Sequence, residues 1–338
     1  MTKLIVSYCN NKYPENYGGV ARFDYCLSLI FPNRIFFKGP EDINLLLDFC
    51  KENNKEDYII ITDNHLSSQI PDEIPLIVVH HGVARTHLER EPNWDIKWKN
   101  LCVYGQDLMF HLRSPKNTVF VSPTIFCKNE FGRIYGKMYN TYKNIYITHA
   151  SELDELVYKT TFNKKPIIVG NWIQDSKGKH LIEELKMLLP EFEFKPLELD
   201  FKNKTIEEYN KEKQDYYMSG DIYLCLSLVE GCSYSLLDAM LTNLLIVSTD
   251  VGIMENEVNK RTFVDLSWNN LDVNLICNKI KYIWENKKDY FNKSREEYFK
   301  ITSWDRWKKE WNNVINYSLL VHATNSSGMI CPPTDQLI

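Results

Sequence analysis

The sequence predicts an α/β protein made of two doubly wound, Rossmann-like parallel sheets. Short apolar segments alternate with helix-like segments along most of the chain, which is the pattern of such sheets. The apolar segments show little alternation of polar and apolar residues, as expected of parallel strands that helices cover on both faces. The 338 residues are also enough for two domains of about 150 residues each.

The first half of the chain shows this alternation clearly. Val20, Phe23, Leu27 and Ile30 have the spacing of one helix face, and the run Leu-Ile-Val-Val at 76–79 has the length of a buried strand. Strands are predicted at residues 4–9, 34–37, 58–62, 76–79, 101–104 and 118–121, and helices at residues 20–31 and 42–52.

The second half repeats the pattern, and the boundary between the halves is placed near residues 144–165. The final stretch, 322–338, contains Ser326-Ser327-Gly328 and Pro332-Pro333, so we expect a flexible tail there. Strands are predicted at residues 145–147, 166–169, 192–197, 222–228 and 245–248, and helices at residues 179–189, 205–218, 234–241, 271–284 and 287–311.

Composition and charge narrow the function. The formal net charge of −5 argues against general nucleic-acid binding, which needs a positive surface. The nine cysteines form no C-x-x-C pair and no cluster of metal ligands, so we expect free thiols, a reducing compartment and no metal site. The residues from Met1 onward lack a signal-peptide pattern, and no apolar run approaches the roughly 20 residues of a membrane helix. We expect a cytoplasmic protein with at most peripheral membrane contact.

The most informative segment starts where a buried strand ends, at Glu230-Gly231, and runs into a helix that begins near residues 233–235. Ligands of doubly wound sheets bind outside the carboxyl ends of the strands. There the N–H groups of Cys232, Ser233 and Tyr234 can receive a phosphate. Asp238, about one turn further along, can accept hydrogen bonds from ribose hydroxyls, and Glu230 can accept them from a sugar. The alternative is an ordinary strand, helix and strand of any α/β protein.

A second segment places Lys177-Gly178 at the start of a helix, after a strand and a glycine turn. A cation beside a helix N-terminus favours a diphosphate, although a solvated lysine gives the same pattern. In the first half, Gly18-Gly19 follows the first strand, and such glycines let a backbone approach a ligand closely or simply form a turn. Arg22 can reach the same region or lie on the surface.

Two adjacent histidines, His80-His81, end the strand predicted at 76–79 and precede Gly82. Histidines at a strand end lie at the mouth of the sheet, where they serve a site or are structural.

Together these segments resemble the retaining GT-B glycosyltransferases of the family-4 type. Their E-x7-E stretch reads roughly E-G-x6-E-A-M-x-x-G-x-P, and Glu230 and Asp238 occupy its two acidic positions. The resemblance implies that Glu230 contacts the donor sugar and that Asp238, one methylene shorter than the family glutamate, contacts the ribose. Asn243 and Leu244-Leu245 stand where the family usually has Gly and Pro.

The Lys177-Gly178 pair resembles the family's G-R-x4-K-G turn, in which Arg and Lys hold the donor diphosphate. Lys177 matches the Lys, whereas Trp172 stands at the Arg position. Full donor affinity then requires Lys179 or Arg22 to supply the missing cation.

The first-half segments carry a looser resemblance. Gly18 and Gly19 resemble the loop that faces the donor phosphates. A family histidine that positions the donor sugar and the reacting oxygen matches His81, since His-Gly is the commoner pairing, or His80 when counted from Pro75.

The resemblance implies an acceptor-side domain at 1–145, a nucleotide-sugar-binding domain at 146–300 and a central cleft. It also implies a helix at 301–321, which contains Trp304 to Trp311 and returns to the first domain. The implied reaction moves a hexose from a nucleotide diphosphate sugar to a hydroxyl of a glycan, lipid or protein-linked sugar. It retains configuration and uses no metal and no cofactor besides this co-substrate.

Other functions remain open. A sugar-nucleotide epimerase or a sugar phosphorylase can have the same fold. An impaired relative that binds a glycan or a partner is a third possibility, because Trp172 and Asp238 depart from the family pattern. An NAD-dependent protein is disfavoured, since no G-x-G-x-x-G follows the first strand.

Overall fold

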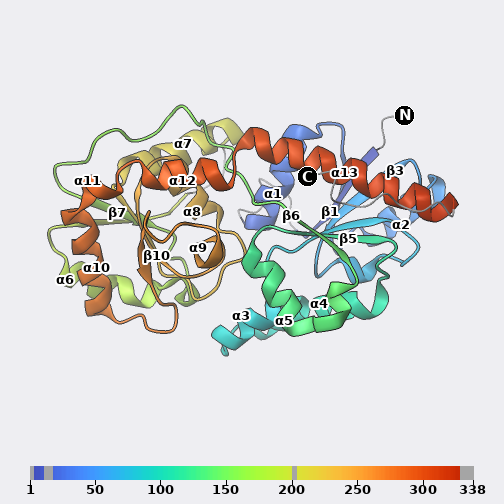
Figure 1. Ribbon diagram of the computed structural model, residues 1–338, viewed down its shortest axis with the longest axis horizontal. Helices are drawn as coiled ribbons and strands as arrows, with labels where there is room; N and C mark the ends of the chain where they lie inside the picture. Colours follow the sequence, from blue (N-terminus) through green and yellow to red (C-terminus); the bar gives the residue numbers. More distant parts are fainter. Residues whose placement is uncertain (1–3, 11–17, 200–203, 328–338) are drawn as a thin grey trace. The chain divides into compact units, whose positions relative to one another are not determined.

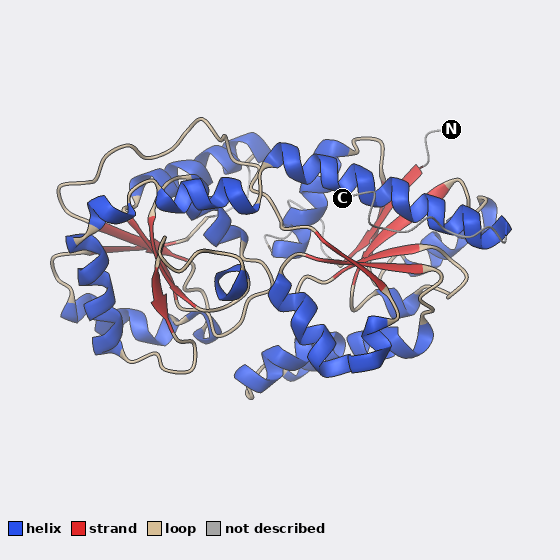
Figure 2. Cartoon of the chain, in the orientation of Figure 1, coloured by secondary structure: helices blue, strands red, loops and turns tan. Residues whose placement is uncertain are grey.

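The structure, a computed structural model, describes residues 4–10, 18–199 and 204–327 (Figure 1). The chain divides into two compact units, which are Met1–Thr148 with Asp305–Ile338 (unit 1) and His149–Trp304 (unit 2). Each unit contains one sheet whose paired strands are all parallel, with helices on both faces (Figure 2). The predicted pair of doubly wound parallel sheets is therefore confirmed.

Unit 1 contains a six-stranded sheet with the order β2-β1-β3-β4-β5-β6. Its chain path reverses direction between β1 and β3, because β1 leads to β2 on one side and β3 leads to β4 on the other. The strands are β1 (Leu4–Cys9), β2 (Ile35–Lys38), β3 (Tyr58–Asp63), β4 (Leu76–Val79), β5 (Thr118–Ser122) and β6 (Lys143–Tyr146). The helices are α1 (Gly19–Ile30), α2 (Ile43–Glu52), η1 (Ser67–Gln69), α3 (Ala84–Arg90), α4 (Ile96–Leu112), α5 (Ile125–Asn140) and α13 (Trp304–Ser327).

Aromatic side chains hold the helices of unit 1 onto the sheet. Helices α1 and α13 lie on one face, and α4 and α5 lie on the other (Figure 1). Trp307 and Trp311 of α13 are fully buried, with ring centroids 6.2 Å and 5.3 Å from that of Phe23 on α1. Burial of such large rings is the main source of hydrophobic stabilisation, so the tryptophans of α13 are packing residues of unit 1.

Unit 2 contains a five-stranded sheet with the order β11-β10-β9-β7-β8, and its chain path reverses between β7 and β9. The strands are β7 (Ile167–Gly170), β8 (Glu193–Pro196), β9 (Ile222–Cys225), β10 (Leu245–Thr249) and β11 (Val264–Leu266). The helices are η2 (Asp175–Lys177), η3 (Lys179–Leu181), α6 (Ile182–Leu188), α7 (Ile206–Ser219), α8 (Tyr234–Leu241), α9 (Ile253–Asn256), α10 (Val273–Glu285), α11 (Lys287–Tyr290) and α12 (Lys293–Ile301).

Alternating strand residues in unit 2 feed two separate hydrophobic cores. Ile168 and Leu224 belong to the core covered by α6 and α10, whereas Val169 and Tyr223 belong to the core covered by α7, α8 and α12. Successive side chains of a strand point to opposite faces, so apolar residues at every position satisfy both cores. This explains why the strands read as continuous apolar runs.

The strand predicted at 101–104 is wrong, because these residues lie inside the 17-residue helix α4. Asp95 is the N-cap of α4, and its side chain accepts hydrogen bonds from the backbone N–H groups of Lys97 and Trp98. A satisfied N-cap starts a helix that continues through the short apolar run. The strand propensity of four residues is therefore outweighed by the stability of the longer helix that contains them.

Three further predictions need correction. The strand predicted at 222–228 ends at Cys225. The helix predicted at 287–311 is three helices, because Asn292 has a φ of 68° and Thr302 is extended. The tail predicted to be flexible from residue 322 is part of α13 up to Ser327, and residues 328–338 lie outside the described chain.

Candidate active site

The chain reversal in unit 2 defines the first candidate site. Doubly wound sheets bind ligands outside the carboxyl ends of the strands at such a reversal, because the loops diverge there. Lys177 lies in the loop after β7, and Glu230 lies in the loop after β9. The sequence motifs carrying these two residues are thus brought to one edge of one sheet.

Close backbone contacts fix these two loops against each other. The N–H of Leu228 donates to the carbonyl of Ser176 at 2.8 Å. Gly178 has a φ of 81°, and a Cβ built on it lies 2.4 Å from Cβ of Leu226. Only glycine fits this left-handed and crowded position. The glycine of the Lys-Gly pair is therefore required by the packing of the two loops.

Lys177 and Glu230 form an ion pair in which Nζ lies 2.7 Å from Oε1. The hydroxyl of Ser227 donates to the same Oε1 at 2.8 Å. Burial opposes the charge on Lys177, but the Glu230 carboxylate outweighs it and raises the pKa of Lys177 above its usual value. The side chains of Lys177 and Glu230 are 22% and 15% exposed, so both are mostly buried and keep limited access to solvent.

The helix α8 starts beside this pair. Ser233 is its N-cap, so Cys232, Ser233 and Tyr234 lie at the end where helix N–H groups point outward. The Tyr234 ring stacks on His149 with centroids 5.0 Å apart. Gly252, with a φ of 55°, packs so closely that its built Cβ lies 2.9 Å from the carbonyl oxygen of Gly231.

Two residues of the resembled motif lie in the interior of unit 2. Asp238 is fully buried, and its Oδ1 accepts a hydrogen bond from Ser151 Oγ at 2.6 Å. Trp172 is buried, and its indole Nε1 donates to the Leu224 carbonyl at 3.0 Å. Lys179, by contrast, is exposed. The ribose role of Asp238 stays a prediction, and Trp172 is a core residue where the family has its arginine.

The chain reversal in unit 1 defines the second candidate site. Asp63 ends β3, and His81 follows β4 on the neighbouring strand. His81 Nε2 lies 3.1 Å from Asp63 Oδ1, and the backbone N–H of Asn10 donates to Asp63 Oδ2 at 2.9 Å. Burial raises the pKa of Asp63, but His81 outweighs this effect and the pKa lies below its usual value.

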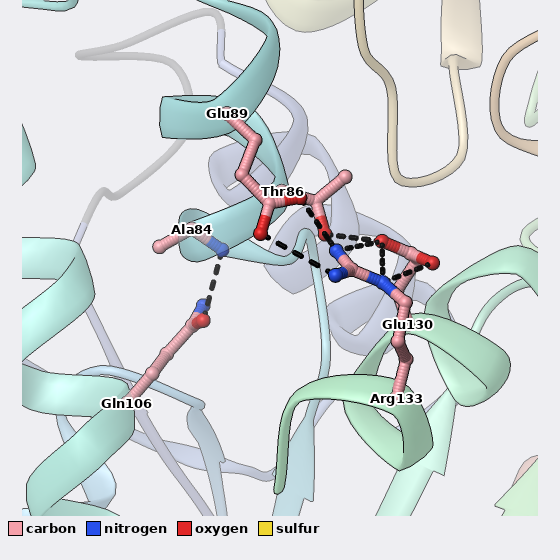
Figure 3. Close-up of polar contacts among 6 residues, drawn as sticks. All are labelled: Ala84, Thr86, Glu89, Gln106, Glu130 and Arg133. Atoms are coloured by element: carbon pink, nitrogen blue, oxygen red, sulfur yellow. Dashed lines mark hydrogen bonds and ion pairs between the residues drawn. The ribbon is translucent and has the colours of Figure 1, made fainter. Parts of the chain in front are cut away.

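The loop after His81 is fixed by two buried amide side chains. The carbonyl of Gly82 accepts a hydrogen bond from Asn64 Nδ2 and another from Gln106 Nε2, both at 2.9 Å. Gln106 Oε1 accepts the N–H of Ala84 at 2.9 Å, which ties the start of α3 to α4 (Figure 3). The backbone that carries His81 therefore has little freedom.

A polar cluster anchors the other side of α3. Arg133 of α5 pairs with Glu130 at 2.8 Å and with Glu89 of α3 at 2.6 Å (Figure 3). Thr86 of α3 donates to Glu130. These contacts hold α3 to α5, and their charges are internally paired.

The structure distinguishes the two histidines. His80 is fully buried, and its ring stacks on Phe131 with centroids 3.9 Å apart. Burial, helped by His81, lowers the pKa of His80 to about 3. His80 is thus a core residue, while His81 is the one at the sheet edge. Gly18 is the N-cap of α1, Gly19 is its first residue, and Arg22 is buried on the same helix.

Sequence reasoning missed Asp63, Ser227, Ser151 and Gln106. Asp63, like Glu230, is an acid that directly follows a buried apolar run in the sequence. The same pattern could therefore have identified Asp63. The other three act through contacts that depend on the fold.

Within the described ranges, no group of three or more His, Cys, Asp or Glu side chains is arranged to hold a metal ion. Across those residues no helix is long and apolar enough to cross a bilayer.

Comparison with known proteins identifies the fold. No protein-family model and no curated protein sequence matches the chain. Among solved structures, a sucrose-phosphate synthase from Thermosynechococcus elongatus matches with a TM-score of 0.70 and 12% identity, over 93% of this chain and 98% of that one. Anabaena HepE in complex with UDP and glucose matches with a TM-score of 0.65 and 12% identity, over 93% and 100%. The pneumococcal O-GlcNAc transferase GtfA in complex with UDP and GlcNAc matches with a TM-score of 0.57 and 16% identity, over 86% and 62%.

These neighbours are GT-B glycosyltransferases, and the chain has the GT-B fold. The fold expected from the sequence motifs is confirmed.

Proposed function

We propose that this protein transfers a hexose from a nucleotide diphosphate sugar, with UDP as the favoured nucleotide, to a hydroxyl acceptor. The observation that carries the proposal is the partly exposed Lys177–Glu230 pair close to the start of α8, at the reversal of the unit 2 sheet. Solved structures of the same fold include complexes with UDP and UDP-glucose, which supports UDP as the nucleotide.

The residues of the site have separable roles in this reaction. Negative charge develops on the diphosphate as its bond to the anomeric carbon breaks, and Lys177 with the N–H groups at 232–234 would stabilise that charge. Glu230 would accept hydrogen bonds from the sugar hydroxyls, and His81 of unit 1 would orient the sugar and the acceptor oxygen. The acceptor oxygen bonds to the anomeric carbon as the bond to the diphosphate breaks, and the acceptor proton passes to the departing diphosphate oxygen.

Two finer features belong to the same proposal. Retention of configuration rests on the resemblance of Glu230 and Asp238 to the E-x7-E stretch, and NMR of the glycosidic product reads the configuration directly. Metal independence rests on Lys177 and the helix amides as the source of positive charge. Turnover that persists in excess EDTA would agree with it.

The proposal is tested with Lys177→Ala and Glu230→Ala, assayed by hydrolysis and transfer over a panel of nucleotide sugars. We expect each variant to lose at least about a hundredfold in kcat/KM, because each removes charge stabilisation or sugar orientation. Lys186→Ala is the matched control, since Lys186 forms an exposed pair with Glu183 at 2.8 Å in the same unit. Full activity in both site variants would overturn the assignment.

A glycan- or partner-binding protein without turnover is the second candidate. It is favoured by Trp172, whose indole lies in the core where the resembled motif has its arginine, so that Lys177 lacks the second cation of the motif. The interior position of Asp238 favours it as well. A glycan ligand would then raise the melting temperature by mass action while no nucleotide sugar is consumed. Measured turnover of any nucleotide sugar decides against this candidate.

A further inference from the structure

We propose that Asp63 is a positioning residue for His81, whose buried carboxylate fixes the imidazole at the edge of the unit 1 sheet. The inference rests on the proposed function, in which His81 orients the donor sugar. Sequence motifs and the resemblance assign no role to Asp63.

The carboxylate of Asp63 is itself held in one orientation. Its Oδ1 lies 3.1 Å from His81 Nε2, and its Oδ2 accepts the Asn10 N–H at 2.9 Å. The Asp63 side chain is 1% exposed, whereas that of His81 is 12% exposed. The Asp63 carboxylate is thus fixed by a backbone N–H at Oδ2 and presents Oδ1 to the less buried imidazole.

The imidazole of His81 is also held from a second direction. Its ring packs edge-on against Phe23, with centroids 4.9 Å apart and an interplanar angle of 69°. Phe23 is fully buried and packs against Trp311 of α13. Phe23 therefore restricts the ring plane, while Asp63 selects the edge of the ring that turns inward.

Charge around His81 supports the same assignment. Asp63, His65 and His80 interact electrostatically with His81. Asp24, Cys9 and Cys102 interact with Asp63. Burial lowers the pKa of both His65 and His80, so these two side chains are neutral near pH 7. A carboxylate can only accept, so Asp63 favours a proton on the His81 Nε2 that faces it.

The test is a double-mutant cycle of Asp63→Asn and His81→Ala, measured as kcat and KM on a nucleotide sugar that the wild type turns over. We expect Asp63→Asn to lower kcat roughly ten- to a hundredfold, as loss of a histidine-orienting group does elsewhere, with little change in donor KM. In the His81→Ala background the same substitution should change kcat little further, because the residue it acts through is absent.

Equal losses of kcat with and without His81 would overturn the proposal, as would an unchanged kcat in Asp63→Asn. Asp24→Asn is the matched control, because Asp24 is a buried acid of the same unit that pairs with Arg34. It should lower stability without kinetic coupling to His81. Should Asp63→Asn fail to fold, Asp63→Glu keeps the charge at a shifted position and should show the same dependence on His81.

An activity-independent measurement separates this inference from the proposed function. Nitrogen-15 NMR of labelled histidines reports which ring nitrogen of His81 carries the proton. We expect Nε2 protonation in the wild type and a mixed population in Asp63→Asn. A wild type without turnover but with this shift contradicts only the proposed function, whereas a tautomer unaffected by the substitution contradicts the role of Asp63.

Discussion

The two units place charged side chains at equivalent points of their sheets, yet in different settings. In unit 2 the Lys177–Glu230 pair joins two loops, and its side chains are 22% and 15% exposed. In unit 1 the Asp63–His81 pair joins two strand ends, and its carboxylate is 1% exposed. A ligand can exchange partners with the first pair, whereas the second is suited to hold a group still. Both pairs thus lie at a reversal of the chain path, and they differ in how deeply they are buried.

The backbone supports of the two sites differ as well. Unit 2 uses close contacts of glycine, at Gly178 and Gly252, to join its loops. Unit 1 uses the side-chain amides of Asn64 and Gln106 to hold Gly82. The close contacts at Gly178 and Gly252 leave no room for a side chain, whereas an amide support can be removed one hydrogen bond at a time.

Among substitutions at the two candidate sites, the largest expected effect on stability comes from Gly178→Ala. The new Cβ meets Leu226 at 2.4 Å in a residue with a φ of 81°, so clash and backbone strain add. We expect a loss of about 3 kcal/mol in the free energy of unfolding, measured by urea titration. Gly82→Ala is the control, because its Cβ meets nothing within 4 Å, and its loss should be below about 0.5 kcal/mol. Equal losses of stability in the two variants would show that the glycine of unit 2 is no more constrained than the one held by amide side chains in unit 1.

A second test uses pH to separate the core histidine from the edge histidine. The folded-state pKa of His80 is about 3, below the ordinary value of about 6.5. Between these values the unfolded chain binds a proton that the folded chain does not, so stability is complete above pH 6.5 or so and falls as pH falls. Between pH 7 and pH 5, the His80→Leu variant should lose about 2 kcal/mol less stability than the wild type.

The pH measurement is urea unfolding at both pH values. His180→Gln is the control, because the His180 side chain is 55% exposed. An undiminished pH dependence in His80→Leu would show that His80 is not the titrating core group. Neither ring nitrogen of His80 has a hydrogen-bond partner in the part of the chain that the structure describes, so the leucine itself should not destabilise the protein at pH 7.

Sequence patterns predicted the sheets well because a buried parallel strand forms a short, continuous apolar run that can be recognised locally. The run 76–79 matched β4 at both ends, and residues 234–241 matched α8. The run 101–104 failed because its apolar residues were assessed without the N-cap Asp95, which begins the helix six residues earlier. Short apolar runs are ambiguous between strand and helix, and a cap is the local feature that decides.

The contacts of the candidate site were predictable only where strand order alone brings two sequence motifs together. Lys177 and Glu230 each follow a strand, so the topology brings them to one edge of the sheet. The contact of Asp238 with Ser151 joins residues 87 positions apart, so no local sequence pattern predicts it. Trp172 matched the family position of an arginine by count, yet its indole lies in the core.

Gln106→Ala tests the amide support of unit 1. It leaves the N–H of Ala84 without its partner on α4, while Gly82 keeps the hydrogen bond from Asn64. A buried donor left unsatisfied costs about 1–2 kcal/mol, which thermal and urea unfolding can resolve. Asn64→Ala should cost less, since Gln106 still donates to Gly82. The reverse order would place the main support on Asn64, in the loop after β3, rather than on α4.

The smallest effect on stability is expected for the pair that defines the unit 2 site. A double-mutant cycle of Lys177→Met and Glu230→Gln should give a coupling of about 1 kcal/mol or less, because both side chains reach solvent. The buried pair of Lys213 and Glu152 has the same 2.7 Å separation at 4% and 2% exposure, so breaking it with Glu152→Gln should cost about 3 kcal/mol or more.

The pH dependence of the Lys177 coupling gives a further check. The folded-state pKa of Lys177 is raised, so its contribution is complete below the unfolded value near about 10.4 and is lost only as pH rises through the folded value. The coupling should therefore be constant from pH 6 to pH 9. A coupling as large as that of the buried pair would mean that Lys177 and Glu230 are held too firmly to change partners. Unit 2 would then resemble unit 1 in carrying a fixed support, and the exchange of Glu230 for a diphosphate would lose its physical basis.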